Sequence, residues 1–221
     1  RSSAPPAGDA YRWSELADDI VALAEALADA CGIDRIDLGV GNSLGGTCML
    51  VAAAAAPERL ARLLLVDPVI LPRERYAHPG VHVGPLARGA LRRQRRFASW
   101  ADVLAGYRTH PFFADWADGA LELYVEHGFV ETEDGEVVLR CAPEVEAAVF
   151  ERATTLDPFA AAEALVVPGT VLHARDSFPR APFEELVRSA PTLRLADLGA
   201  GHLAPLTDPA RVAGLIRQSL A

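Results

Sequence analysis

The chain has 221 residues, of which 51% are hydrophobic, and a formal net charge of −9. This length suits one domain with a sizeable core and room for an inserted lobe, and the hydrophobic content excludes a disordered chain. The acidic balance argues against a nucleic-acid partner, and no apolar run approaches the roughly 18 residues of a membrane helix, so no membrane partner is expected.

The cysteines indicate the cellular compartment, and the first residue indicates how the chain arose. Cys31, Cys48 and Cys141 are odd in number and widely spaced. This pattern favours reduced thiols in the cytoplasm over disulfides or a metal site, and we expect no cofactor. The only methionine is Met49 and the chain opens with Arg1. We interpret it as a processed product or a piece of a longer sequence.

The first third of the chain predicts helix and strand in alternation. Residues 1–13 are rich in Pro, Ser and Gly and predict a surface loop. Ser14 is expected to cap a helix with apolar residues at helical spacing, which Gly32 ends. There follow a predicted strand at 36–40, a helix of small residues at 44–56, and a strand buried on both faces at 63–66. This order is typical of a parallel βαβ unit.

From Pro68 to about Asp157 the pattern changes. Prolines and glycines cluster first, then arginines, then aromatic residues. We expect a mainly helical insertion over residues 69–156. The α/β pattern then resumes with a strand at 170–174, a helix at 182–189, a strand at 193–198 and a closing helix at 209–220.

The residues Gly41-Asn42-Ser43-Leu44-Gly45 match the G-x-S-x-G nucleophile elbow, and they lie between a predicted strand and a predicted helix, as that motif requires. The sharp turn exposes the hydroxyl of Ser43, and Gly41 and Gly45 are expected where a Cβ would clash. The helix that begins at Leu44 points its positive end at the site, and the backbone N–H of Leu44 is expected to be one oxyanion donor.

A serine nucleophile needs a base and an orienting acid. His202 lies in a glycine-rich loop after a predicted strand, and Asp176 follows the strand at 170–174. We favour Asp176 as the acid because the elbow predicts the chain order serine, acid, histidine. Asp67 is the alternative acid, since it follows the strand at 63–66 and could also reach His202.

Four segments, GVGNSLGG, LLLVDPV, VPGTVLHARDSFP and GAGHLAPLTDP, resemble the α/β-hydrolase superfamily, specifically its capped serine hydrolases. The resemblance implies an α/β-hydrolase fold: a mostly parallel sheet with helices on both faces and a helical cap insertion. The hydrolase core would comprise residues 1–68 and 157–221, and the cap residues 69–156. It also implies a small-molecule substrate with an acyl or ester group, and leaves the oligomeric state open.

The family's N-terminal strands have no counterpart here, because Arg1–Pro6 resembles the loop just past them. We therefore expect the second oxyanion donor to be missing from this chain and the strand at 36–40 to have a bare edge. The cap is expected to cover Ser43, with Trp100, Phe112, Phe113 and Trp116 as substrate-binding residues.

Three functions stay open at this point. The first is a serine hydrolase of a carboxylic ester or related acyl bond, with Ser43, Asp176 and His202 as its triad. The second is an incomplete or non-catalytic fragment. The third is a thioesterase, an acyltransferase or a carbon–carbon bond hydrolase with the same triad.

Overall fold

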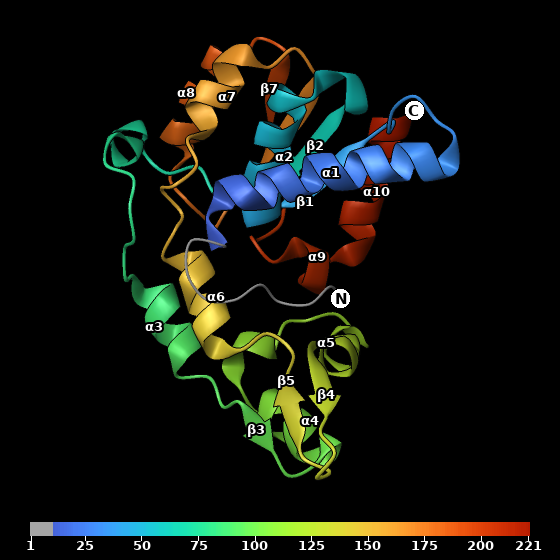
Figure 1. Cartoon of the computed structure of the whole chain (residues 1–221), viewed down its shortest axis with the longest axis vertical. Helices are drawn as coiled ribbons and strands as arrows, with labels where there is room; N and C mark the ends of the chain where they lie inside the picture. Colours follow the sequence, from blue (N-terminus) through green and yellow to red (C-terminus); the bar gives the residue numbers. More distant parts are fainter. Residues whose placement is uncertain (1–10) are drawn as a thin grey trace.

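The computed structural model describes residues 11–221, which form an α/β core and a smaller lobe drawn below it (Figure 1). The surface loop predicted for residues 1–13 lies mostly outside the described part. The core comprises α1 (Trp13–Cys31), β1 (Gly39–Asn42), α2 (Leu44–Ala55), β2 (Leu63–Val66), α7 (Pro158–Ala164), β6 (Gly169–His173), α8 (Arg180–Ser189), β7 (Leu193–Asp197), α9 (Ala204–Thr207) and α10 (Pro209–Leu220).

The core strands form one parallel sheet in the order β1-β2-β6-β7. Asn42 pairs with Val66, and Val66 pairs with Leu172, so these three strands end level with one another. Because all are parallel, the residues that follow them emerge side by side at one edge of the sheet. This is the edge where active sites of open α/β sheets collect.

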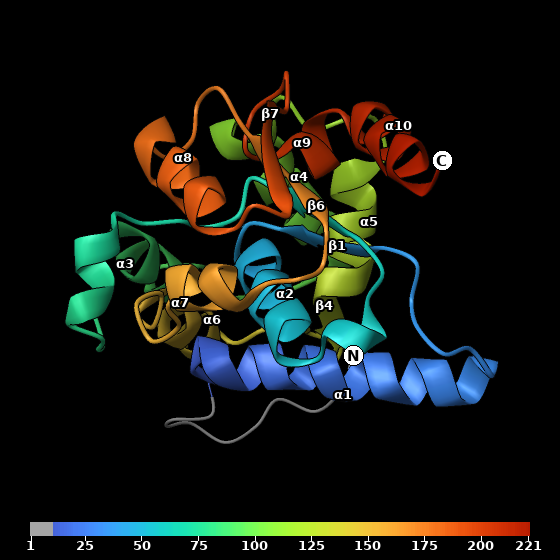
Figure 2. The same ribbon diagram turned by 90° about the horizontal axis from the view of Figure 1, so that it is seen from above.

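Helices cover both faces of this sheet. In β2, Leu63 and Leu65 pack in a cluster with residues of α2, α7 and α8, whereas Leu64 and Val66 face α9 and α10. Burial on both faces explains why β2 is a continuous apolar run. The long helix α1 lies outside α2, as the view from above shows (Figure 2). The predicted α/β fold with helices on both faces is therefore confirmed.

Most predicted boundaries lie within two residues of the observed ones, and two differences near the N-terminus of the described part concern the start of an element. Ser14 does not cap α1, because the helix starts at Trp13 with Arg12 at the N-cap and no side-chain cap; Gly32 ends it in the left-handed region, as expected. The strand predicted at 36–40 begins later, at Gly39, and Ile36 forms only an isolated bridge with Leu60.

Among the described residues, β1 forms an edge of the sheet, and its Val40 is 36% exposed. The open edge expected at this strand is thus present in the described part of the chain. No helix within residues 11–221 is both long enough and apolar enough to cross a membrane.

The lobe, which the sequence predicted to be mainly helical, contains a small sheet beside its helices. Its elements are α3 (Pro85–Leu91), β3 (Arg96–Phe97), α4 (Trp100–Arg108), α5 (Ala120–Gly128), β4 (Phe129–Glu131), β5 (Val137–Leu139) and α6 (Pro143–Phe150). The three strands form an antiparallel sheet, β3-β5-β4. Asp134-Gly135, with Gly135 at φ 80°, turns the β4–β5 hairpin. That dipeptide is a strong hairpin signal, but strands of three residues are too short to show a period.

Two hydrogen bonds join the lobe to the core at separate places. The indole N–H of Trp13 in α1 donates to the carbonyl of Val149 in α6, at 2.9 Å. The backbone N–H of Ala117 donates to the carbonyl of Leu206 in α9, at 2.8 Å. The second contact joins the aromatic part of the lobe to the helix that follows His202.

Candidate active site

Ser43 occupies the tight turn between β1 and α2. Its backbone has φ 55° and ψ −124°, a strained combination for a residue with a side chain. Backbone hydrogen bonds fix this turn. The N–H of Ser43 donates to the carbonyl of Val66, and the carbonyl of Ser43 accepts the N–H groups of Gly46 and Val69. The half-buried hydroxyl therefore projects from the carboxyl edge of the sheet.

The glycines of this turn differ in whether the surrounding structure leaves space for a Cβ atom. A Cβ on Gly41 would lie 2.4 Å from the carbonyl oxygen of Gly45, so only glycine fits there. The clash expected at Gly45 is absent, because a Cβ there meets nothing within 4 Å. Gly46 is the second crowded position: its Cβ would lie 3.0 Å from the oxygen of Gly41 and from Cβ of Pro68.

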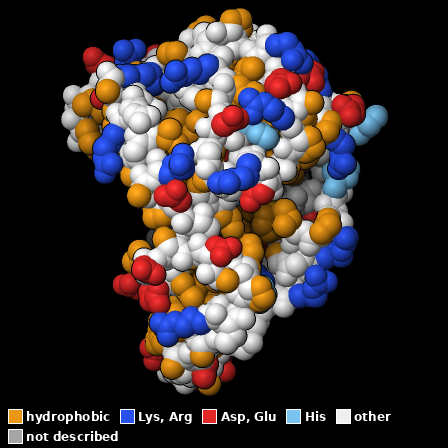
Figure 3. Space-filling model, turned by 180° about the vertical axis from the view of Figure 1, so that it is seen from behind, with side chains coloured by type: hydrophobic (Ala, Val, Ile, Leu, Met, Phe, Trp, Pro, Cys, Tyr) orange, Lys and Arg blue, Asp and Glu red, His pale blue; other side chains and the backbone are white. Residues whose placement is uncertain are grey.

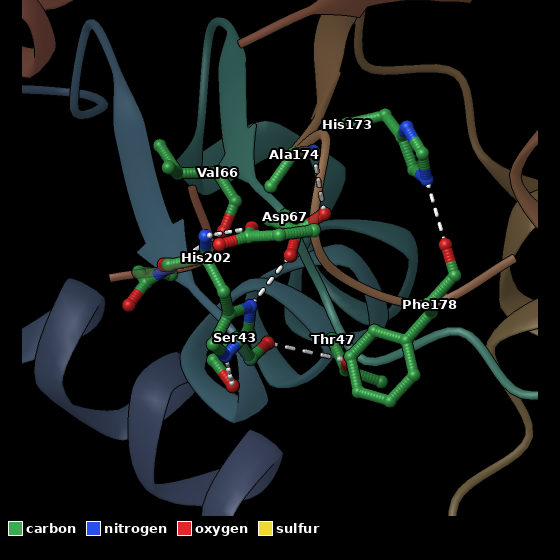
Figure 4. A network of polar contacts seen from close by, with 10 residues as sticks. Ser43, Thr47, Val66, Asp67, His173, Ala174, Phe178 and His202 are labelled. Carbon is green, nitrogen blue, oxygen red and sulfur yellow. Dashed lines mark hydrogen bonds and ion pairs between the residues drawn. The ribbon is translucent and has the colours of Figure 1, made fainter. Parts of the chain in front are cut away.

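His202 joins the nucleophile to a carboxylate (Figure 4). Its Nε2 lies 3.0 Å from Oγ of Ser43, and its Nδ1 lies 2.5 Å from Oδ2 of Asp67. The Phe178 ring stands edge-on to the imidazole, with ring centres 5.9 Å apart. Ser43, His202 and Asp67 thus form a hydrogen-bonded chain of the kind that can activate a serine hydroxyl.

Asp67 is built into the core. Its side chain is fully buried, and its other carboxylate oxygen accepts the backbone N–H of Ala174 at 2.9 Å. Burial acts to raise the pKa of Asp67, but the hydrogen bonds from His202 and Ala174 outweigh it, so the pKa lies below its ordinary value. Asp67 is thus ionised at neutral pH and can orient an imidazole.

Two residues of this site, Ser43 and Asp67, have a strained backbone conformation. Ser43 and Asp67 are the non-glycine residues with positive φ within residues 11–221. Both directly follow adjacent strands, β1 and β2. Such strain persists where the surrounding structure holds it, and it clusters at functional sites.

The preference for Asp176 as the orienting acid does not match this geometry. The Asp176 carboxylate accepts the backbone N–H of His202 at 3.0 Å, and the ring nitrogen is bonded to Asp67 instead. Chain order after the elbow pointed to the end of β6, but the end of β2 lies next to Ser43 in the sheet. The adjacency of β1 and β2 therefore favours the alternative acid, Asp67.

Asn42, which sequence reasoning passed over, also belongs to the site. Its side-chain N–H donates to the carbonyl of Val66 at 2.8 Å and lies 3.5 Å from the carbonyl of His202. In the sequence, Asn42 stood out only as the first variable residue of the G-x-S-x-G motif. Leu44 opens α2, so its N–H has no carbonyl one turn earlier to bind; its role as an oxyanion donor stays a prediction. The expected lack of a second donor in this chain also stays a prediction.

The aromatic residues expected to line the site fall into two groups. Phe112, Phe113 and Trp116 pack against one another beside the turn that contacts α9. Trp100 lies elsewhere, on the wall of a cavity of about 410 Å³ formed by α4, α5 and β4, and no residue of the Ser43 site lines that cavity. Apolar side chains also gather in the hollow between core and lobe (Figure 3).

A model described as the alpha/beta hydrolase family matches residues 1–215. The chain belongs to the α/β-hydrolase family. No curated protein sequence matches this α/β-hydrolase at a significant level.

Solved structures resemble this α/β-hydrolase in fold. The peroxisomal α/β-hydrolase Lpx1 of Saccharomyces cerevisiae is 18% identical with a TM-score of 0.80, over 94% of this chain and 58% of that one. E-2-(Acetamidomethylene)succinate hydrolase is 21% identical with a TM-score of 0.74, over 99% and 76%. An α/β hydrolase from Novosphingobium aromaticivorans is 24% identical with a TM-score of 0.64, over 99% and 76%. The chain thus spans less than two thirds of the yeast protein's length.

Proposed function

We propose that this α/β-hydrolase is a serine hydrolase that cleaves a carboxylic ester or related acyl bond of a small molecule, with Ser43, His202 and Asp67 as its triad. The observation that carries the proposal is the continuous chain of contacts from Asp67 through His202 to the hydroxyl of Ser43. A cytoplasmic location and a lid role for the lobe belong to the same proposal.

In this mechanism the Ser43 hydroxyl attacks the acyl carbon while its proton moves to Nε2 of His202. The ionised Asp67 accepts the Nδ1–H, which keeps Nε2 free as the base and stabilises the imidazolium. The oxyanion is held by the Leu44 N–H at the positive end of α2. His202 then returns the proton to the leaving group, and water hydrolyses the acyl-enzyme by the reverse sequence.

The lid role is supported by the contact between Ala117 and Leu206, which places the turn that carries Trp116 against the helix following His202. Phe112 is 55% exposed on that turn, which gives the lobe apolar surface near the core. Substrates would then be small or medium in size and apolar near the scissile bond.

A fluorophosphonate probe tests the nucleophile, because it reacts covalently with an activated serine. We expect it to label the unsubstituted protein and Ser189→Ala, whose substitution lies on α8, but not Ser43→Ala. Labelling that survives Ser43→Ala would overturn the assignment. Absence of labelling in a folded chain would favour the non-catalytic alternative.

A panel of p-nitrophenyl esters and acyl thioesters of equal chain length separates the acyl chemistries. An ester hydrolase turns over the oxygen esters at rates at least comparable with the thioesters. A strong preference for thioesters would move the proposal to the thioesterase alternative, and acyl transfer to an added alcohol would move it to an acyltransferase.

A further inference from the structure

We propose that Asp176 is a positioning residue that fixes the main chain of His202, a role separate from the orientation of the imidazole ring by Asp67. This inference rests on the proposed function of Ser43 and His202. In the structure, the two carboxylates hold different parts of the same histidine: Asp67 contacts the ring and Asp176 contacts the backbone N–H.

The loop that carries His202 needs such support. It reads Gly199-Ala200-Gly201, and glycines give a backbone more freedom than other residues do. Gly199 adopts φ 69°, which is accessible at little cost only to glycine. A histidine that must hold Nε2 at hydrogen-bonding distance from a serine cannot tolerate a loose backbone, since a shift of about 1 Å can cost a hundredfold in rate.

The last residue of β6 and the residues after it bind the segment before His202 at successive points. The carbonyl of His173 accepts the N–H of Leu198 at 2.9 Å, and the N–H of Arg175 donates to the carbonyl of Ala200 at 3.3 Å. The Arg175 guanidinium donates to the carbonyl of Gly199 at 3.0 Å. The carboxylate of Asp176, accepting the N–H of His202 at 3.0 Å, continues this series to the catalytic position itself.

The carboxylate of the exposed residue Asp176 lies against the glycine that precedes His202. A Cβ on Gly201 would lie 2.6 Å from Oδ2 of Asp176, so the carboxylate occupies the space beside the glycine. On the opposite side, the amide of Asn42 lies 3.5 Å from the carbonyl of His202. The N–H and the carbonyl of His202 are therefore both approached by side chains from the ends of core strands.

The second-order rate of fluorophosphonate labelling measures the readiness of Ser43 without a known substrate. We expect Asp176→Ala to slow labelling about ten- to a hundredfold, since the histidine loses its backbone support. We expect Asp176→Asn to stay within about threefold, because the amide oxygen still accepts the N–H. The ratio of variant to unsubstituted labelling rate should be the same from pH 6 to pH 9, because Asp176 contacts the backbone N–H of His202 and not its ring.

Gly201→Ala displaces the Asp176 carboxylate without removing it, and should slow labelling as Asp176→Ala does. Gly214→Ala is its matched control, because a Cβ there, on α10, meets nothing within 4 Å. Melting temperatures establish that each variant is folded.

Two results would overturn the proposal. The first is a folded Asp176→Ala that is labelled at the unsubstituted rate. The second is an Asp176→Asn as slow as Asp67→Asn, which would show that the Asp176 charge acts on the ring. Failure of the proposed function is visible separately, because labelling would then survive Ser43→Ala.

Discussion

Replacing Asp67 by asparagine separates the two acids. In the structure one oxygen of Asp67 accepts the N–H of Ala174 and the other accepts Nδ1–H of His202. Asparagine keeps the first contact through its own oxygen, and its NH₂ then faces the ring. The imidazole must present Nδ1 as an acceptor, so Nε2 carries the proton and cannot act as the base. We expect turnover to fall about ten-thousandfold, which corresponds to about 5 kcal/mol in the activation barrier.

The assay is hydrolysis of p-nitrophenyl acetate, with kcat and KM measured separately and folding checked by circular dichroism. Binding of the small ester does not involve Asp67, so kcat should carry the loss. Asp176→Asn serves as the matched comparison, since it removes one charge from the same histidine's surroundings. If Asp67→Asn kept kcat within tenfold while Asp176→Asn lost it, Asp176 would be the orienting acid and the reasoning from geometry would fail.

Four further outcomes can be checked. The difference in unfolding free energy between the unsubstituted protein and Asp67→Asn should be constant from pH 7 to pH 5 and shrink as the pH falls through the folded pKa of Asp67, which lies below 3.8. The reason is that a carboxyl group with a depressed pKa stabilises the fold only while it is ionised. Urea unfolding at each pH measures this difference, and a difference that already shrank above pH 5 would contradict the depressed pKa. Gly41→Ala should unfold or inactivate the protein because its Cβ would meet the backbone at 2.4 Å, whereas Gly45→Ala should leave the melting temperature unchanged or raised; equal effects would refute this reading of the elbow. Trp116→Ala should change the ratio of kcat/KM for p-nitrophenyl hexanoate over acetate by about tenfold if the lobe is a lid, and an unchanged ratio would count against a lid. Trp13→Ala should lower the free energy of unfolding by about 3–5 kcal/mol and Trp13→Phe by about 1–2 kcal/mol through the lost indole hydrogen bond; equal losses would assign the whole effect to the hydrogen bond, because Phe keeps most of the ring packing that Ala removes.

The sequence predicted the core well because its signals are local. The strand at Leu63–Val66 and the elbow at Ser43 each depend on a few adjacent residues, and both were predicted in place. The same is true of Gly32 at the end of α1. His202 was identifiable because a lone histidine in a glycine-rich loop after a strand is a strong feature.

What the sequence did not decide depends on contacts between distant segments. Asp67 and Asp176 both follow strands, and only the strand order brings one of them to the ring of His202. The open space at Gly45 depends on what packs beside the turn, which the motif does not encode. Trp100 shares its aromatic character with Trp116, and the fold of the lobe alone separates their surroundings.

The position of the acid at the end of β2 has a consequence for engineering. Ser43 and Asp67 both precede the lobe in the chain, and His202 follows it, so the proposed triad divides into two pieces at the lobe. The exposed hairpin turn at Asp134-Gly135 offers a place to cut the chain without removing any residue of the site. Neither piece would contain both nucleophile and base. Fused to two proteins that bind each other, the halves would form an ester-cleaving reporter whose signal depends on that association.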